Sequence, residues 1–557
     1  MRLHRAPLLL ALILLLGAGP SLAAGVTGPA DAGRIDERMP NLPEPTVAAP
    51  TPEQHVLPPI NAPQGSKALT FTLHSVTVDG MHALSEADVQ KIYMPYVGRV
   101  ITLDTVWLIA QQITDLYHDR GYFLSQVTVP AQELGEGNVQ LHAVEGYIGE
   151  VVFDDPLKDQ PVVRDWIARL QSYHPITQQQ IESILLQLND LPGLELHSVL
   201  EPMPNQTDGA VRVTLVREKT HGTGQVGIDD NGSRYLGPYE MSAQYDASFL
   251  PLEDTSLGVM GALPLKKMRY GSIHQEIPLY PALNLELYGS NTVAKPGYTL
   301  STEDIDSNSL LVGMAFNYKW IRQRQENLST RVAFESRDTT ADILGTPLTR
   351  DHIRVLRAGL TYEKYDNWAG NNLATFTFTE GLDGLGASAA GSQDLSRAQA
   401  TPDFQKAELL LTRVQGLGPD WNAVASASGQ WASGPLFSSE EFGYGGQAFG
   451  RAYDDSEITG DEGIAGTLEL RYMSLPQIGE VSLTPYGFYD IGKIWNDDVG
   501  QVPSAAGSSA GAGVRFASSH GITANLGLAF PLTRPIDTPL YGNGKNPRYL
   551  VQVMYGF

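Results

Sequence analysis

The sequence predicts two small α+β domains, each with the order β-α-α-β-β, followed by a transmembrane antiparallel β-barrel of roughly 16 strands. Three observations predict this fold class. Helical periodicity occurs in two similar blocks before residue 220 and is lost after residue 221. Alternating apolar and polar residues recur through the rest of the chain. The last ten residues form an alternating aromatic strand that ends on Phe557.

The first 23 residues predict a secretory signal peptide. Arg2 and Arg5 precede the apolar run from Leu8 to Leu16, and small residues around Ala23 suit a signal peptidase. Cleavage is expected after Ala23 or Ala24. The apolar run is too short to span a membrane as a helix, so the sequence predicts export and no helical anchor at this point.

Composition excludes several classes of function. The 557 residues include no Cys and carry a net charge of −24. Without Cys there is no thiol nucleophile, Cys-ligated metal or disulfide framework, and a chain that crosses an oxidising compartment unfolded benefits from this. The negative charge argues against a nucleic-acid partner. The twelve His show no metal-binding spacing. We therefore expect neither an enzyme nor a cofactor.

Residues 24–68 are rich in Pro, Ala and Gly, which predicts an extended linker. A short helix around Ala32–Met39 is compatible with the sequence.

The two predicted α+β domains cover residues 69–146 and 147–218. Helices are expected where apolar residues recur every three or four positions, and strands where they alternate. In the first domain these are a strand at 71–78, helices at 84–97 and 102–121, and strands at 123–130 and 138–146. In the second they are a strand at 148–153, helices at 161–173 and 176–193, and strands at 194–202 and 209–218. The repeated order indicates a tandem duplication of one unit.

Residues 221–557 are predicted to form the barrel. In the segment 239–249, Tyr and Met residues alternate with charged and polar ones, as expected for strands with lipid outside and water inside. In GTLELRY (466–472), Thr467, Glu469 and Arg471 are predicted to face inward. In the last strand one face carries the aromatic and branched residues Tyr549, Val551, Val553, Tyr555 and Phe557. We expect this strand to close the barrel and to direct the chain to the outer membrane.

Two short motifs are interpreted as coincidences. GTGQVG (222–227) matches a dinucleotide-binding pattern, but a strand follows it where that fold needs a helix. GSSAG (507–511) matches a nucleophile elbow but lies among small residues, and we expect a flexible loop there.

Six further motifs, in order along the chain, resemble those of the TpsB outer-membrane transporters of two-partner secretion, the haemolysin and filamentous haemagglutinin secretion-activation family. The motifs are LYHDRGYFLSQVTVPAQELGEGNVQLHAVEGYIGEV (116–151), LNDLPG (188–193), DDNGSRYLGPYE (229–240), SSEEFGYGGQAFGRAY (438–453), GDEG (460–463) and FYDIG (488–492). By this resemblance the two small domains are similar to periplasmic POTRA domains, and the chain is expected in the outer membrane of a Gram-negative bacterium.

The resemblance also implies a site inside the barrel. In the family, a long sixth extracellular loop folds back into the pore, and its tip Arg pairs with the Asp of an F-x-D-x-G motif on the wall. The matching residues are Arg451, with Gly450 and Tyr453 beside it, and Asp490, with Phe488 and Gly492. Strand alternation independently directs Asp490 into the lumen, where a carboxylate favours an Arg partner. A gating role for the loop follows from the resemblance.

The sequence departs from the family pattern in two places. Ala452 stands where the family usually has Gly, which would strain the loop tip if that position required φ > 0. Prolines in 40–64 limit any plug helix in the pore to a short one.

The expected partners are a secreted exoprotein with an N-terminal secretion domain, outer-membrane lipid, and the barrel-assembly machinery during biogenesis. Two alternatives remain open. An outer-membrane assembly insertase shares the barrel and the Arg–Asp pair but usually has more POTRA units. An enzyme or adhesin displayed on a barrel would need a passenger domain, for which residues 25–220 leave no room.

Overall fold

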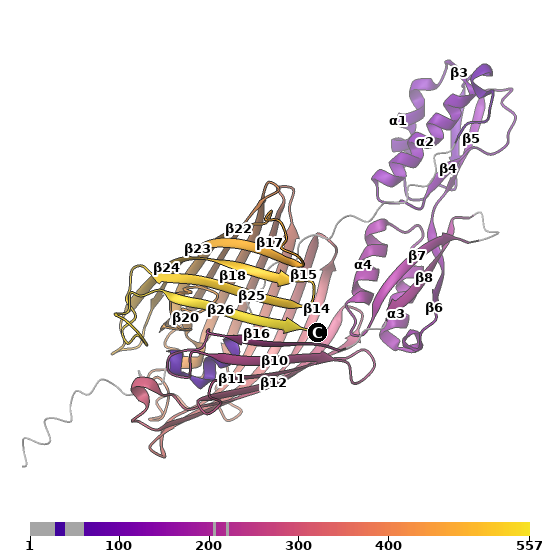
Figure 1. The fold of residues 1–557 in the computed structure, drawn as a ribbon. Coiled ribbons are helices and arrows are strands. Elements are labelled where there is room, and N and C mark those ends of the chain that lie inside the picture. The colour runs from indigo at the N-terminus through magenta and orange to yellow at the C-terminus, as the bar shows by residue number, and fades with distance from the viewer. Residues whose placement is uncertain (1–27, 39–60, 204–207, 219–221) are drawn as a thin grey trace, which may run out of the picture.

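The computed structural model describes residues 28–38, 61–203, 208–218 and 222–557. Two small α+β domains lie beyond one end of a long β-barrel (Figure 1). The signal peptide and most of the Pro-rich segment fall outside the described residues. The predicted fold class is confirmed, because sixteen antiparallel strands form a closed barrel. Among the described residues, no helix is long and apolar enough to cross a membrane.

The first domain packs two helices on a three-stranded sheet in the order β2-β5-β4, with β2 parallel to β5. Its elements are β1 (Thr70–Thr72), β2 (Ser75–Asp79), α1 (Glu86–Tyr93), β3 (Val100–Thr102), α2 (Leu103–Asp119), β4 (Gln126–Thr128) and β5 (Asn138–Val144). Helix α1 has Ser85 as its N-cap, since the Ser85 side chain accepts from the Asp88 N–H. The stripe of Val106, Ile109 and Ile113 on α2 is buried against the sheet.

The strand predicted at 71–78 is two strands with different partners. Residues 70–72 pair with β3, whereas 75–79 pair with β5. The change occurs at Leu73 and His74, whose N–H groups donate to Arg99 O and Gly137 O. Alternation alone could not reveal this break, because both pieces keep the same period.

The motif around Glu145 and Gly146 has a structural role in this domain. The Glu145 carboxylate accepts hydrogen bonds from Tyr117 Oη at 2.7 Å and from the backbone N–H groups of His82 and Ala83. A Cβ on Gly146 would lie 2.4 Å from the Leu124 side chain. Only Gly therefore fits where the first domain passes into the second.

The second domain repeats this topology, with sheet order β6-β8-β7 and β6 parallel to β8. Its elements are β6 (Tyr147–Phe153), α3 (Pro161–Gln171), α4 (Gln178–Asn189), β7 (Glu195–Pro202) and β8 (Ala210–Glu218). Thr177 and Gln180 form a capping box at the start of α4. Trp166 and Leu188 lie in the core between the helices and the sheet.

Helix α4 also connects this domain to the barrel. Asp190, directly after α4, accepts from Arg322 Nε and Nη2 at 2.8 Å each and from Lys319 Nζ at 2.9 Å. Both cations belong to the barrel strand β14.

Each barrel strand pairs with its two neighbours, and the last strand closes on the first. The strands are β9 (Thr223–Asp229), β10 (Glu240–Ala247), β11 (Asp254–Ala262), β12 (Met268–Tyr280), β13 (Leu283–Ala294), β14 (Ile305–Arg322), β15 (Glu326–Ile343), β16 (Thr346–Tyr365), β17 (Gly370–Gly381), β18 (Gln405–Leu417), β19 (Trp421–Ala432), β22 (Glu462–Tyr472), β23 (Val481–Trp495), β24 (Ser504–Ser518), β25 (Ile522–Pro531) and β26 (Arg548–Gly556).

Alternation along the strands separates the two faces of the wall. On β14, Leu310, Val312 and Met314 are exposed on the outside, whereas Ser307 and Ser309 are buried toward the lumen. This is the pattern of a barrel with lipid outside.

The expected loop at GSSAG is wrong, because residues 507–511 lie within β24. Small residues are needed there for packing. A Cβ on Gly507 would lie 2.6 Å from the Tyr444 ring, and one on Gly511 would lie 2.5 Å from Phe488.

Candidate functional site

The lumen contains the connection between β19 and β22, residues 433–461, which we call loop 6 because it is the sixth connection at the end of the barrel away from the small domains. It carries a short helical turn, η8 (Ser438–Glu440), and a two-stranded hairpin of β20 (Phe442–Tyr444) and β21 (Ile458–Gly460). Most of its residues are buried. The loop therefore folds back into the barrel.

Arg451 at the loop tip lies against Asp490 of β23. The Arg451 N–H donates to Asp490 Oδ2 at 3.0 Å, and Nη2 donates to Oδ1 at 2.9 Å. Arg451 is 7% exposed and Asp490 is fully buried. Removing one partner of a buried ion pair costs about 3–5 kcal/mol, because the other charge is left uncompensated.

The two other residues of the F-x-D-x-G motif serve the same loop. The Phe488 ring lies under the Arg451 guanidinium, 3.6 Å from ring centroid to Cζ. Gly492 leaves room for Tyr444 of loop 6, since a Cβ there would lie 2.2 Å from the Tyr444 ring. At alternate positions of β23 the motif thus supplies an aromatic ring (Phe488), a counter-charge (Asp490) and a position without a side chain (Gly492).

The residues beside Arg451 shape the loop tip. Gly450 adopts φ +94°, which favours Gly. Ala452 is buried and does not adopt a positive φ, so the Ala in place of the family Gly causes no backbone strain. The Tyr453 hydroxyl shares its single proton between two backbone acceptors, Arg534 O at 2.9 Å and Ser508 O at 3.2 Å. These bonds connect the tip to the end of β24 and to the loop after β25.

Sequence reasoning missed Glu469 as a partner of Arg451. Glu469 Oε2 accepts from Arg451 Nη1 at 2.6 Å, while Arg471 and Arg515 also donate to this carboxylate. Thr467 and Ser509 donate to Asp490. The sequence did indicate that residues 467, 469 and 471 face inward. It did not contain the register of β22 on β23, which places Thr467 opposite Asp490 and so brings Glu469 close to Arg451.

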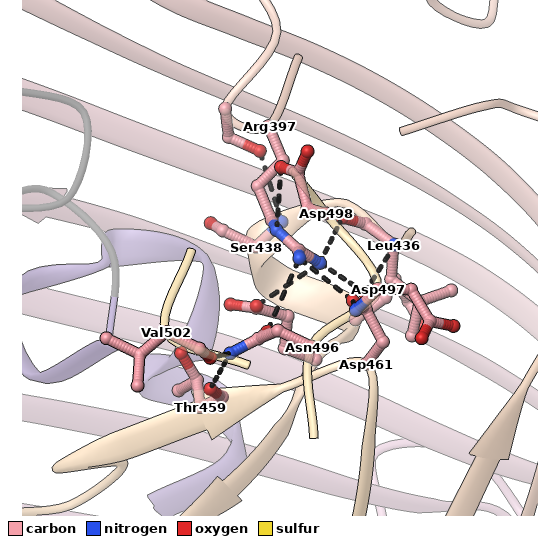
Figure 2. A network of polar contacts seen from close by, with 12 residues as sticks. Arg397, Leu436, Ser438, Thr459, Asp461, Asn496, Asp497, Asp498 and Val502 are labelled. Carbon is pink, nitrogen blue, oxygen red and sulfur yellow. Dashed lines mark hydrogen bonds and ion pairs between the residues drawn. The ribbon is translucent and has the colours of Figure 1, made fainter. Parts of the chain in front are cut away.

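A second cluster of charges holds the base of loop 6. Figure 2 shows Arg397, from the connection between β17 and β18, directed at Asp461. Arg397 Nη1 and Nη2 both donate to the Asp461 carboxylate, the latter at 2.9 Å. Asp461 also accepts from the N–H groups of Leu436 and Asp497. The Asp of the GDEG motif therefore joins three loops at the mouth of the barrel.

A third group of contacts places loop 6 against the junction of the first and last strands. Arg234, after β9, donates to Asp454 Oδ2 at 2.7 Å and forms two hydrogen bonds with Glu457. Arg548, at the start of β26, donates to Asp454 Oδ1 at 3.0 Å and to Tyr453 O at 2.6 Å. Arg234 lies within the DDNGSRYLGPYE motif, which the sequence had singled out, but the sequence did not indicate its partners Asp454 and Glu457.

The segment 28–38 also lies inside the barrel, as the indigo turn in Figure 1 shows. It contains η2 (Gly28–Ala30) and η3 (Ala32–Arg38). Arg337 of β15 binds Asp36 through Nη2–Oδ2 at 2.7 Å and donates to Gly33 O at 2.6 Å. Arg34 donates to Ser438 O at 3.0 Å and Glu441 O at 2.8 Å in loop 6. The segment thus bridges the wall and the loop.

The predicted terminal strand closes the barrel. Phe557 exchanges two backbone hydrogen bonds of 2.9 Å with Gly224 near the start of β9. The five aromatic and branched residues predicted on one face all lie on the outside: Tyr549, Val551, Val553, Tyr555 and Phe557.

Ion pairs and aromatic contacts hold loop 6 and residues 28–38 in the lumen, and non-covalent contacts of this kind can break and form again. Among the described residues, no group of three or more His, Asp or Glu is arranged to hold a metal ion.

Comparison with protein-family models gives two matches. Residues 71–146 match the ShlB-type POTRA domain. Residues 209–514 match the haemolysin secretion/activation protein family ShlB/FhaC/HecB, over more than half of the chain. The chain belongs to this family. Its members are outer-membrane transporters of the TpsB type, with periplasmic POTRA domains, in Gram-negative bacteria, and the predicted location is thereby confirmed.

Individual ShlB/FhaC/HecB relatives are distant in sequence. The heme/hemopexin transporter protein HuxB of Haemophilus influenzae is 22% identical over 473 residues, covering 81% of each chain. The outer membrane transporter CdiB of Dickeya dadantii is 22% identical over 512 residues, covering 87% of this chain and 88% of CdiB.

The solved structure of CdiB from Escherichia coli superposes with a TM-score of 0.71 at 18% identity, covering 89% of this chain and 92% of CdiB. CdiB from Acinetobacter baumannii gives 0.62 at 15% identity, covering 97% and 99%. This likeness supports the fold.

Proposed function

We propose that this protein translocates a large unfolded exoprotein from the periplasm to the cell surface. The observation that carries the proposal is a 16-strand barrel whose lumen is filled by loop 6 and residues 28–38, both held by separable polar contacts. A lumen filled by the protein's own segments can be cleared for an extended chain without breaking the wall. Membership of a family of secretion transporters supports the same function.

The two POTRA domains would capture the N-terminal secretion domain of the partner. Strand β7 lies at the edge of its sheet and carries the exposed Val199, so it offers unpaired backbone groups to an extended segment. Addition of a strand to such an edge is a common way to bind a peptide. Folding of the partner outside the cell would then make export irreversible.

Loop 6 is proposed to regulate passage through the pore. Arg451 holds the loop tip to β22 and β23 through Asp490 and Glu469. Movement of the loop requires these ion pairs to exchange for contacts with water or with the passing chain. The pairs lie at the wall of a polar lumen, where such an exchange is feasible.

The test is secretion of a candidate partner by Arg451→Ala. We expect the partner in the medium to fall to the level without transporter, because Asp490 and Glu469 lose their common counter-charge. Arg413→Ala is the matched control: Arg413 is also a wall arginine, but it binds Asp366 and Asn372 outside loop 6. Heat-modifiable migration in gels verifies that each barrel is folded.

Two outcomes would contradict parts of the proposal. Partner in the medium without any transporter would refute translocation of that cargo. Normal secretion by Arg451→Ala would be consistent with translocation through the barrel but would refute the proposed role of Arg451.

The insertase alternative is not favoured. The described chain contains two POTRA-like domains, and the family model that matches the barrel is that of secretion transporters.

A further inference from the structure

The junction between β26 and β9 is incompletely paired. Its register runs from Gln552 opposite Asp229 to Gly556 opposite Gln225, which is the shortest pairing in the barrel. Strand β26 continues for four more residues, to Arg548, while the chain after β9 turns away. Val551 and Asp230 exchange two hydrogen bonds at the end of the pairing, of 2.8 and 3.0 Å. Beyond this point the ladder between β26 and β9 ends, and the Arg548 side chain instead donates to Asp230 O at 3.1 Å and Gly232 O at 3.2 Å.

A cavity of about 590 Å³ lies at this end of the junction, lined by residues of β9, of β26 and of the chain after β9. Ile228, Val551, Tyr239 and Tyr549 all line it, and all four are exposed on the outer face of the barrel. The loop between β25 and β26, residues 532–547, covers it with Leu540 and Tyr541. Its volume and mainly apolar lining are those of a small-ligand site.

The exposed part of the cavity lining lies on the lipid-facing surface near the outer end of the barrel. Phe557 marks the periplasmic end, because it pairs with Gly224 shortly after the second POTRA domain. Arg548 therefore marks the extracellular end of β26. Tyr239 and Tyr549 are each 59% exposed, and tyrosines are typical of the membrane interface. The molecules in contact with this surface are thus lipids of the outer leaflet.

The charges that line the cavity favour the apolar part of such a lipid. Arg234 and Arg548 also line the cavity, but Asp454 and Glu457 already bind them. Asp229 and Asp230 line the same space and add negative charge. A phosphate group would be repelled by these carboxylates, and the arginines that could bind it are already paired with Asp454 and Glu457. A hydrocarbon chain needs only the apolar sides.

We propose that this cavity binds one acyl chain of an outer-leaflet lipid. The chain enters between Tyr239 and Tyr549 and lies along Ile228 and Val551, and its head group stays at the interface. It occupies the side of β26 that faces away from β25, where the pairing with β9 has ended. The inference rests on the outer-membrane location and not on the proposed cargo.

The test uses the full-length protein in phosphatidylcholine nanodiscs. One lipid probe carries a photoreactive diazirine near the end of an acyl chain, and a second carries it on the choline group. We expect the acyl probe to modify residues 228–239 and 536–551 more than the lipid-facing residues of β14. Equal modification of β14 and of the cavity would overturn the proposal. Preferential modification by the choline probe would indicate a head-group site and would also overturn it.

Val551→Trp fills the cavity and should abolish the excess modification. Val553→Trp is the matched control, because both valines are 40% exposed on the same face of β26 but Val553 does not line the cavity. Leu540→Ser changes only the cover of the cavity and should also reduce the excess, which keeps the test valid if Val551→Trp does not fold. Unchanged excess in both cavity variants would refute the site.

Discussion

At the scale of single residues, loop 6 depends on small residues in the wall as much as on its ion pairs. Tyr444 lies over both Gly492 and Gly507, so the loop can approach the wall only where side chains are missing. Arg451 lies over Phe488, beside this contact. The ion pair of Arg451 and the close packing of Tyr444 therefore hold loop 6 at neighbouring positions of the wall.

We expect Gly492→Ala to displace loop 6 without unfolding the barrel. The added Cβ would lie 2.2 Å from the Tyr444 ring, so the ring must move, and overpacking of this kind costs about 1–3 kcal/mol. Limited proteolysis of loop 6 in the purified protein should become faster.

Gly487→Ala on the same strand is the control, since its Cβ would meet only Gly511 O at 3.8 Å. Equal proteolysis rates for the two variants would show that the contact with Tyr444 does not hold the loop.

At the scale of secondary-structure elements, the end of α4 sets the position of the second POTRA domain relative to β14. Burial raises the pKa of the Asp190 carboxyl, but hydrogen bonds and charges from Arg322 and Lys319 outweigh it, so its pKa lies below the usual 3.8. A carboxylate with a lowered pKa in the docked state favours docking above its ordinary pKa. That contribution is lost as the pH falls through the lowered value.

The expected result is a domain that stays docked at neutral pH and separates from the barrel only in strong acid. Asp190→Asn should separate at neutral pH, because the amide cannot compensate two cations. Distances between spin labels on α4 and on the periplasmic end of β14 measure this. Asp165→Asn on the exposed side of α3 is the control, and a distance that does not respond to Asp190→Asn would contradict the docking role.

At the scale of the whole molecule, sixteen strands close the wall and two segments of the chain occupy the lumen. The pairing of strands runs around the whole barrel and is shortest between β26 and β9, and the occupants of the lumen are loop 6 and residues 28–38. Both occupants are held mainly by arginines: Arg34 and Arg451 belong to the occupants, and Arg337 belongs to the wall.

We expect Asp36→Ala to increase the conductance of the protein in planar lipid bilayers. The change removes the two hydrogen bonds and the ion pair that join the Asp36 carboxylate to Arg337, which weakens the hold of the wall on residues 28–38. Asp342→Ala is the control, because Asp342 pairs with Arg350 at a half-exposed position. Equal conductance of Asp36→Ala and the unaltered protein would mean that this segment does not limit the pore.

The sequence by itself determined the alternation of the barrel strands, the repeat of the two small domains and the inward direction of Asp490, while its pairing with Arg451 was implied by the family resemblance. These features are local: they depend on periods of two or 3.6 residues, or on short motifs. Only the tertiary structure decided that Glu469 and Asp490 share one arginine, that Arg397 reaches Asp461, and that GSSAG lies within a strand. All three depend on which segments distant along the chain come to lie side by side. For the strands this is the register, which the sequence of either strand alone does not contain. The end of the ladder beside Arg548 belongs to the same class, because it arises from the pairing of the first barrel strand with the last.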